Sequence, residues 1–143
     1  MSYERFIAEH ARIDASGEAL LELTGADQPD VPAVIIALSD LSCELTGHLA
    51  HEDSLIYPRM IAARNTELSE TASHFVEEFA ALRADWDVYL REWGSDAIAG
   101  DWQEFREQTR SILARLAKRV RAENDLLYPA AFRAGLLPLR DVA

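Results

Sequence analysis

The sequence predicts an all-α protein with the architecture of an up-down-up-down antiparallel four-helix bundle. Its 143 residues suit one hydrophobic core, so we expect a single domain over residues 1–143. Glycine and proline gather at a few places and leave four long segments between them. Within each segment the apolar residues recur at the spacing of a helix that buries one face. Short connections between long helices favour antiparallel neighbours.

The four helices are predicted over residues 2–23, 32–63, 67–93 and 101–132. Residues 25–30 and 94–100 are rich in glycine or turn-forming residues and are expected to be loops. Residues 64–66 form a tighter break. Asp30 and Thr66 are the expected N-caps of the second and third helices, because a short side-chain oxygen can accept a free N–H of the first turn.

Two of these helices resemble copies of one unit. The seam of the helix over 32–63 has a 3-4-3-4-3 spacing and consists of Leu38, Leu41, Leu45, His48, Glu52 and Leu55. The helix over 101–132 repeats that seam 71 residues later as Thr109, Ile112, Leu116, Arg119, Glu123 and Leu126. The match extends to Tyr57-Pro58 and Tyr128-Pro129. Each copy embeds a polar pair in an apolar seam, and burying such a pair is costly unless something satisfies it.

Each predicted helix also offers two polar side chains four residues apart, and therefore on one face. The pairs are His10 and Asp14, His48 and Glu52, His74 and Glu78, and Arg119 and Glu123. Neutral imidazole with carboxylate is the ligand mix of iron, zinc or manganese, and helical bundles build such sites in their interior. Ferritin-like di-iron proteins use Glu-x-x-His, whereas no histidine here has an acid three residues earlier. The sequence therefore predicts a metal site of another kind.

Several candidate ligands also have an interpretation without a metal. A buried ion pair would explain His48 with Glu52, and a salt bridge to Arg119 would explain Glu123 equally well. Asp14 is expected to orient a neighbouring histidine rather than to bind the metal itself.

Other side chains near the candidate ligands have structural interpretations. Phe75 and Phe79 compete with His74 for the inward-facing stripe of the third helix. His51 is expected at the surface or behind the ligands, and Cys43 is expected to be a small core residue. The two tyrosines of the repeat are expected in the core, with partners for their hydroxyl groups.

The sequence resembles the hemerythrin-like, or HHE cation-binding, family over essentially its whole length. The resemblance rests on His10, on His48-x-x-x-Glu52 with Tyr57-Pro58, on His74, and on Glu123 with Tyr128-Pro129. Members of that family typically hold a non-haem di-iron centre that binds or senses oxygen, nitric oxide or peroxide. The implied ligands are His10 and His48 for one iron, Glu52 and Glu123 as bridges, and His74 and Glu78 for the second iron.

The fourth helix departs from the family pattern, which has histidine where this chain has Arg119. Arginine stays protonated and has no lone pair to donate, so it cannot ligate a metal. Two outcomes follow. Either a second metal binds weakly through His74, Glu78 and the bridging acids, or Arg119 replaces that metal electrostatically. In the second case the protein holds one metal or none, and a metal-poor regulatory or interaction protein is the alternative function.

Charge and composition limit the other function classes. The net charge of −11 lacks the basic footprint that nucleic-acid binding needs. No secretory pattern opens the chain and its only cysteine cannot form an internal disulfide, so we expect a cytoplasmic protein, with no membrane partner. Nearly all the basic residues are arginine and alanine is abundant, as in proteins from GC-rich bacterial genomes. A homodimer is compatible with the sequence.

The expected partners are a metal ion and a small diatomic or peroxide ligand. No nucleophile elbow, phosphate loop or pair of catalytic acids is present in the sequence, so no enzyme is predicted from motifs. Turnover of peroxide or nitric oxide at the metal centre is the enzymatic alternative.

Overall fold

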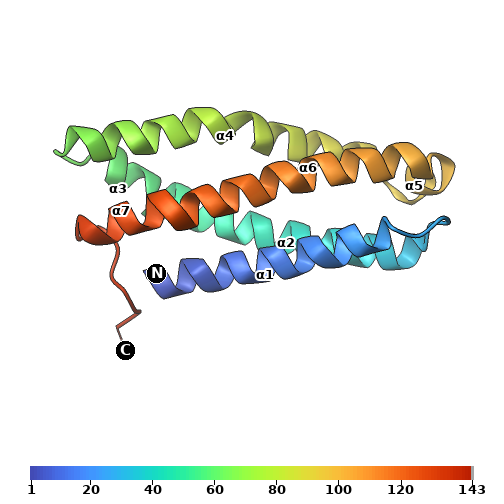
Figure 1. The fold of residues 1–143 in the computed structure, drawn as a ribbon, viewed down its shortest axis with the longest axis horizontal. Coiled ribbons are helices and arrows are strands. Elements are labelled where there is room, and N and C mark those ends of the chain that lie inside the picture. The colour runs from blue at the N-terminus through green and yellow to red at the C-terminus, as the bar shows by residue number, and fades with distance from the viewer. Residues whose placement is uncertain (143) are drawn as a thin grey trace.

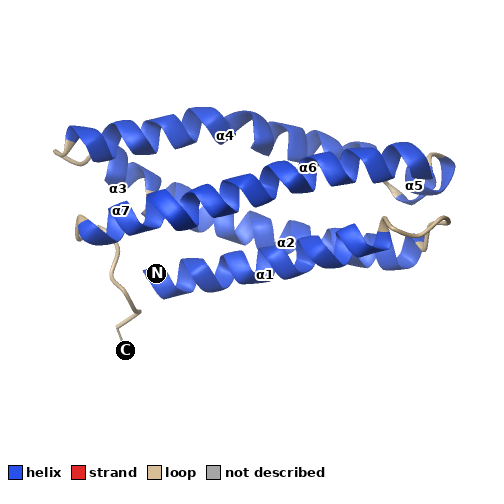
Figure 2. Ribbon diagram, in the orientation of Figure 1, coloured by secondary structure: helices blue, strands red, loops and turns tan. Residues whose placement is uncertain are grey.

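The computed structural model describes residues 1–142, which are helical with short connections and contain no strand (Figure 2). The elements are α1 (Tyr3–Leu23), α2 (Val31–Leu55), α3 (Tyr57–Ile61), α4 (Thr66–Glu92), α5 (Ser95–Gly100), α6 (Trp102–Ala122), the π-helical turn η1 (Glu123–Leu127) and α7 (Tyr128–Arg133). The predicted all-α class is confirmed.

The long helices α1, α2, α4 and α6 lie side by side, and the short helices α3 and α7 lie at the end of the molecule that holds the N-terminus (Figure 1). Backbone hydrogen bonds tie the two ends of the chain together there. The N–H groups of Tyr3 and Glu4 donate to the carbonyls of Pro138 and Leu139 at 2.8 and 3.0 Å. Apolar side chains from all four long helices form one buried cluster.

The second and fourth predicted helices are each interrupted near their ends. The helix predicted over 32–63 breaks at Ile56, between α2 and α3, and the helix predicted over 101–132 passes through η1 into α7. Pro58 and Pro129 stand in the first turn after each interruption. Proline lacks an N–H and clashes with the carbonyl four residues earlier, so the α-helical ladder cannot run through either position.

These interruptions shift the buried face by one residue. The seam positions Leu55 and Leu126 were predicted inside, but Leu126 is 59% exposed and Leu55 only half-buried. Ile56 and Leu127, one residue later in each copy, are buried instead. The prediction is wrong at Leu126 because it assumed an unbroken α-helical period through η1.

Three local predictions about caps and loops have different outcomes. Asp30 caps α2 as predicted, because its side chain accepts the N–H of Ala33. Asn65 rather than Thr66 caps α4, by accepting the N–H of Leu68. The loop predicted over residues 94–100 is mostly the short helix α5.

The predicted inward direction of His74 and Glu78 is wrong. The buried residues of α4 are Leu68, Ala72, Phe75, Phe79, Leu82, Trp86 and Tyr89, which alternate at intervals of four and three. His74 and Glu78 each precede a member of that stripe and therefore point about 100° away from it. Their side chains are 73% and 38% exposed and form an ion pair at 3.5 Å on the surface. The free energy gained by burying two phenylalanine side chains determines which face of α4 turns inward.

Cys43 is exposed, and its predicted place in the core is wrong. It lies between the buried positions Leu41 and Leu45 of α2, so its side chain points away from their face.

The segment Val31–Ile61 is long and apolar enough to cross a membrane by length and composition, with a mean hydropathy of 1.3 over an 18-residue window. Core helices also meet that criterion. The helix α2 packs against α1 and includes His48 and Glu52 among its buried residues.

The orientation of α4 can be tested by comparing two adjacent substitutions. Phe75→Ala should lower the free energy of unfolding by about 3–5 kcal/mol, because it leaves a cavity in the core. His74→Ala should change it by less than about 0.5 kcal/mol, because the side chain is exposed. Urea unfolding of both variants measures the difference. A larger loss in His74→Ala would show that α4 is rotated relative to this structure.

Candidate metal centre

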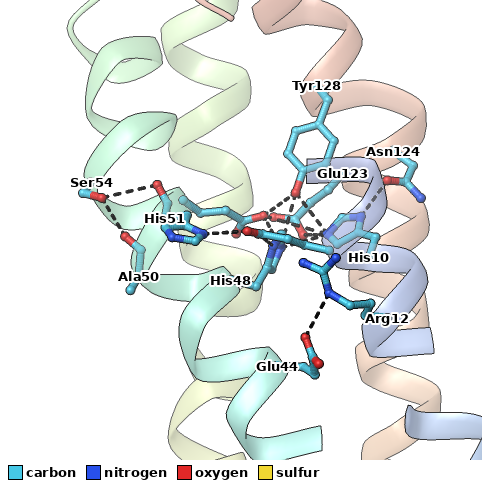
Figure 3. A network of polar contacts seen from close by, with 12 residues as sticks. His10, Arg12, Glu44, His48, Ala50, His51, Ser54, Glu123, Asn124 and Tyr128 are labelled. Atoms are coloured by element: carbon cyan, nitrogen blue, oxygen red, sulfur yellow. Dashed lines mark hydrogen bonds and ion pairs between the residues drawn. The ribbon is translucent and has the colours of Figure 1, made fainter. Parts of the chain in front are cut away.

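Four potential metal ligands from three different elements meet in the interior. They are His10 of α1, His48 and Glu52 of α2, and Glu123 of η1. One donor atom from each lies within 4.8 Å of the others. All four side chains are buried, with no more than 3% of any residue exposed. Figure 3 shows His10, His48 and Glu123 directed toward one another beneath the ring of Tyr128.

The spacing of these donors suits a single ion. The two Nε2 atoms of His10 and His48 lie 2.9 Å apart, and Nε2 of His48 lies 2.7 Å from Oε1 of Glu52. Nε2 of His10 lies 3.3 Å from Oε1 of Glu123. Donors bonded to one transition metal at about 2.1 Å lie about 3 Å apart when adjacent. The set of two imidazoles and two carboxylates therefore fits one ion of the iron, manganese or zinc type.

Hydrogen bonds behind the two histidines direct their Nε2 atoms inward. Nδ1 of His48 lies 2.8 Å from Oε2 of Glu9, and Nδ1 of His10 lies 2.6 Å from Oδ1 of Asn124 (Figure 3). Both partners are oxygen acceptors, so each Nδ1 donates its proton and leaves Nε2 as the lone-pair atom of a neutral ring. Carboxylate and amide oxygens behind histidine are common orienting partners in metal sites.

Glu9 links the interior to the surface. Its Oε1 accepts from Nδ1 of His51 at 2.7 Å while its Oε2 accepts from His48. His51 is the outer member of this chain, with 41% of its side chain exposed. The expectation that His51 lies at the surface or behind the ligands is confirmed.

Arg119 lies on the opposite side of the two carboxylates. Its Nη2 donates to Oε2 of Glu52 at 2.9 Å, and its Nε lies 3.5 Å from Oε2 of Glu123. The guanidinium carbon lies 5.5 Å from the ring centroid of Phe79, in a cation–π arrangement. The hydroxyl of Tyr57 also donates to Oε2 of Glu123, at 2.7 Å. Each carboxylate thus directs one oxygen to the histidines and the other to Arg119.

The charged groups of the cluster shift one another's pKa values. Burial alone would raise the pKa of Glu52, but its hydrogen bond to His48 and the charges of His48 and Arg119 lower it to about 2. Burial and the negative charge of Glu52 raise the pKa of Glu123. Burial alone would lower the pKa of His48, but its bonds to Glu52 and Glu9 raise it. Without a metal, therefore, these surroundings favour the protonated form of His48 more than water does.

The structure brings together four of the six predicted ligands, namely His10, His48, Glu52 and Glu123. His74 and Glu78 lie outside the cluster, on the surface of α4. Asp14 is exposed and does not take the predicted orienting place, because Nδ1 of His10 is bonded to Asn124. A second metal bound through His74 and Glu78 is therefore incompatible with this arrangement.

Sequence reasoning missed Glu9 and Asn124, and it treated Tyr128 only as a core residue with an unspecified partner. Glu9 is at helical spacing with the buried Phe6 and Ile13 of α1, a signal that could have placed it inside. Asn124 lies next to Glu123 on a π-helical turn that the sequence pattern did not reveal.

The comparisons with known proteins agree with this site. The Hemerythrin HHE cation binding domain matches residues 1–131. Neither the comparison with curated proteins nor that with solved structures gives a match. The matched region contains every residue of the cluster, from the histidine of α1 to the tyrosine of α7. The chain belongs to the hemerythrin HHE cation-binding domain family.

Proposed function

We propose that this protein binds one iron ion between His10, His48, Glu52 and Glu123, and that it binds or senses oxygen or a reactive oxygen or nitrogen species there. The convergence of two imidazole nitrogens and two carboxylate oxygens in a buried site carries this proposal. Iron accepts this mixture of ligands. When bound, it would supply the electrons needed to react with such small molecules.

The proposal is for one ion rather than the di-iron centre typical of the family. The two carboxylates each direct one oxygen toward the histidines, where an ion can bind. Their other oxygens already face the guanidinium of Arg119, at 2.9 and 3.5 Å. A second cation beside Arg119 would meet a buried like charge and no histidine, because His74 lies on the surface.

A pocket lies on the arginine side of the two carboxylates, across from the histidines. Its volume is about 240 Å³, and its walls include Phe75, Phe79 and Ala80 of α4. Arg119 and Tyr57 also line it, and both contact the carboxylates of the site. Its lining combines apolar side chains with the charged Asp53 and Arg83 and contains none of the four proposed ligands. We propose that a small molecule reaches the ion from this pocket past Arg119 and Tyr57, whose guanidinium and phenol can donate hydrogen bonds to a reduced or anionic oxygen species.

The bundle topology and cellular location that we propose are those expected from the sequence. We take the four long helices as an up-down-up-down antiparallel bundle that forms one domain, and we propose a cytoplasmic location. The cluster would then lie near one end of the bundle, close to the short helices α3 and α7 (Figure 1).

A metal-free regulatory or interaction protein is the second candidate, and one observation favours it. Every buried side-chain nitrogen and oxygen in the described part of the chain has a hydrogen-bond partner without a metal. Arg119 and a protonated His48 would then balance the charge of the two carboxylates. Metal analysis separates the two candidates.

Iron binding should require an interior histidine, and it should not require a surface histidine. After iron-supplemented expression, the purified protein and His74→Ala should contain about one iron per chain, since His74 is exposed. His48→Ala should contain almost none, because it removes a ligand. Elemental analysis measures the ratio, and chelator treatment of the wild type should lower its Tm. A metal-free wild type with an unchanged Tm would favour the second candidate.

The role of Arg119 can be tested with two replacements of different chemistry. Arg119→Leu removes the cation without adding a ligand, and should destabilise the metal-free protein by about 3–5 kcal/mol, because it leaves buried carboxylate charge unpaired. Arg119→His restores the family residue and should raise the iron content above that of the wild type. Denaturant unfolding and elemental analysis provide the two readouts. Equal iron contents in both variants would contradict our account of Arg119.

Reaction with small molecules should depend on the pocket beside Arg119. Adding oxygen, peroxide or nitric oxide to the ferrous protein should change its visible absorption spectrum. Ala80→Phe narrows the pocket and should slow that change, whereas Ala81→Phe, at the next exposed position of α4, should not. Stopped-flow absorption measures the rates. An iron-loaded protein that responds to none of the three would contradict the sensing function while leaving iron binding intact.

A further inference from the structure

The hydroxyl of Tyr128 lies among the proposed ligands rather than behind them. Its oxygen is 2.6 Å from Oε1 of Glu52, 3.0 Å from Nε2 of His10 and 3.3 Å from Nε2 of His48. The residue is fully buried. Figure 3 shows its ring pointing down into the cluster from the side opposite His48. The phenol oxygen therefore faces the same space as three of the four donors.

The backbone of η1 places this oxygen. Tyr128 follows Glu123 by five residues, which in an α-helix would put the two side chains about 140° apart around the axis. Here the N–H of Tyr128 donates to the carbonyl of Glu123, which is the hydrogen bond of a π-helical turn. The wider turn takes up an additional residue and brings Tyr128 into the cluster that contains Glu123. Such turns are frequent at functional sites.

The single proton of the Tyr128 phenol accounts for only one of its three contacts. A phenol has a single proton, and the shortest contact assigns it to Glu52. When both rings are neutral and donate from Nδ1, the Nε2 atoms of His10 and His48 direct lone pairs at the phenol oxygen. In the metal-free protein a proton on Nε2 of His48 relieves this contact, and a bound cation would do the same. Oxygen and nitrogen lone pairs at 3.0–3.3 Å repel one another unless a proton or a cation lies between them.

We propose that Tyr128 is a fifth metal ligand and binds iron through its phenolate oxygen. This inference rests on the proposed iron site and deepens it. The distances from the phenol oxygen to the other donors, 2.6–3.3 Å, match those between adjacent ligands of one ion. Phenolate is an established iron ligand in proteins. A third anionic oxygen favours the ferric over the ferrous state, because it compensates the additional positive charge.

The chain contains a matched tyrosine at the corresponding position of the other repeat. The hydroxyl of Tyr57 contacts Oε2 of Glu123 at 2.7 Å, on the side of Arg119. The two copies of the repeat thus supply one phenol to the histidine side of the carboxylates and one to the arginine side. Only Tyr128 is placed to reach an ion held by His10 and His48.

The metal-free protein keeps the phenol protonated. Burial, with the negative charges of Glu52 and Glu123, raises the pKa of Tyr128 well above its usual value. A cation bound among these ligands displaces the proton, which is released to solvent as the oxygen–metal bond forms. The phenolate should therefore be detected only after metal is added.

The test uses ferric citrate as the source of iron and the full chain as the protein. Ferric loading of the wild type should produce a phenolate-to-iron charge-transfer band in the visible region, with phenolate vibrations enhanced in the resonance Raman spectrum. Tyr128→Phe should lose both signals. Tyr57→Phe should retain both, because Tyr57 lies on the arginine side. Iron content is measured on each sample.

The outcomes separate this inference from the proposed function. A wild type that binds iron without the band overturns the inference and leaves the iron site in place, whereas a wild type without iron overturns the iron site itself. A band that survives Tyr128→Phe, or disappears in Tyr57→Phe, also overturns the inference. If Tyr128→Phe no longer holds iron, the band is assigned from Tyr57→Phe instead. A band that persists in that variant supports Tyr128 as its source. The two remaining tyrosines have other surroundings, because Tyr89 is bonded to Thr109 and Tyr3 is only half-buried.

Discussion

The buried contact between Arg119 and the two carboxylates is the interaction on which the rest of the site depends. Two acids close together in an apolar interior repel each other and lose hydration, so they need a cation. Arg119 supplies one permanently on one side, at 2.9 Å from Glu52. The opposite side needs positive charge as well, from a proton or a metal ion, and the histidines are oriented to accept either. Because Arg119 is always charged, only the histidine side of the carboxylates can exchange a proton for a metal ion.

The interruptions of the second and fourth predicted helices serve the same site. Both copies of the repeat carry proline six residues after the seam carboxylate, and each helix is interrupted just before that proline. The break in the first copy places the hydroxyl of Tyr57 on the arginine side, and the π-turn in the second places that of Tyr128 on the histidine side. A continuous α-helix would have buried Leu126 and turned Tyr128 away from Glu123.

The predictability of individual residues follows from the strength of their periodic signal. His48 and Glu52 lie in an uninterrupted apolar seam, so their inward direction could be predicted. His74 lies next to Phe75, and the larger gain from burying the aromatic stripe decided the rotation of α4. Asn124 could not be assigned, because its direction depends on a π-turn and its partner, His10, is 114 residues away in the sequence.

The sequence by itself determined the all-helical class, the paired repeat and four inward-facing candidate ligands, because helical periodicity records which face of each helix is buried. It also established that Arg119 cannot bind a metal, since that follows from the chemistry of one side chain. Only the tertiary structure decided which faces meet. It placed Arg119 across the carboxylates from His10 and His48, excluded His74, and brought the phenol of Tyr128 among the ligands. These outcomes depend on contacts between distant segments and on local breaks in helical period, which a one-dimensional pattern does not record.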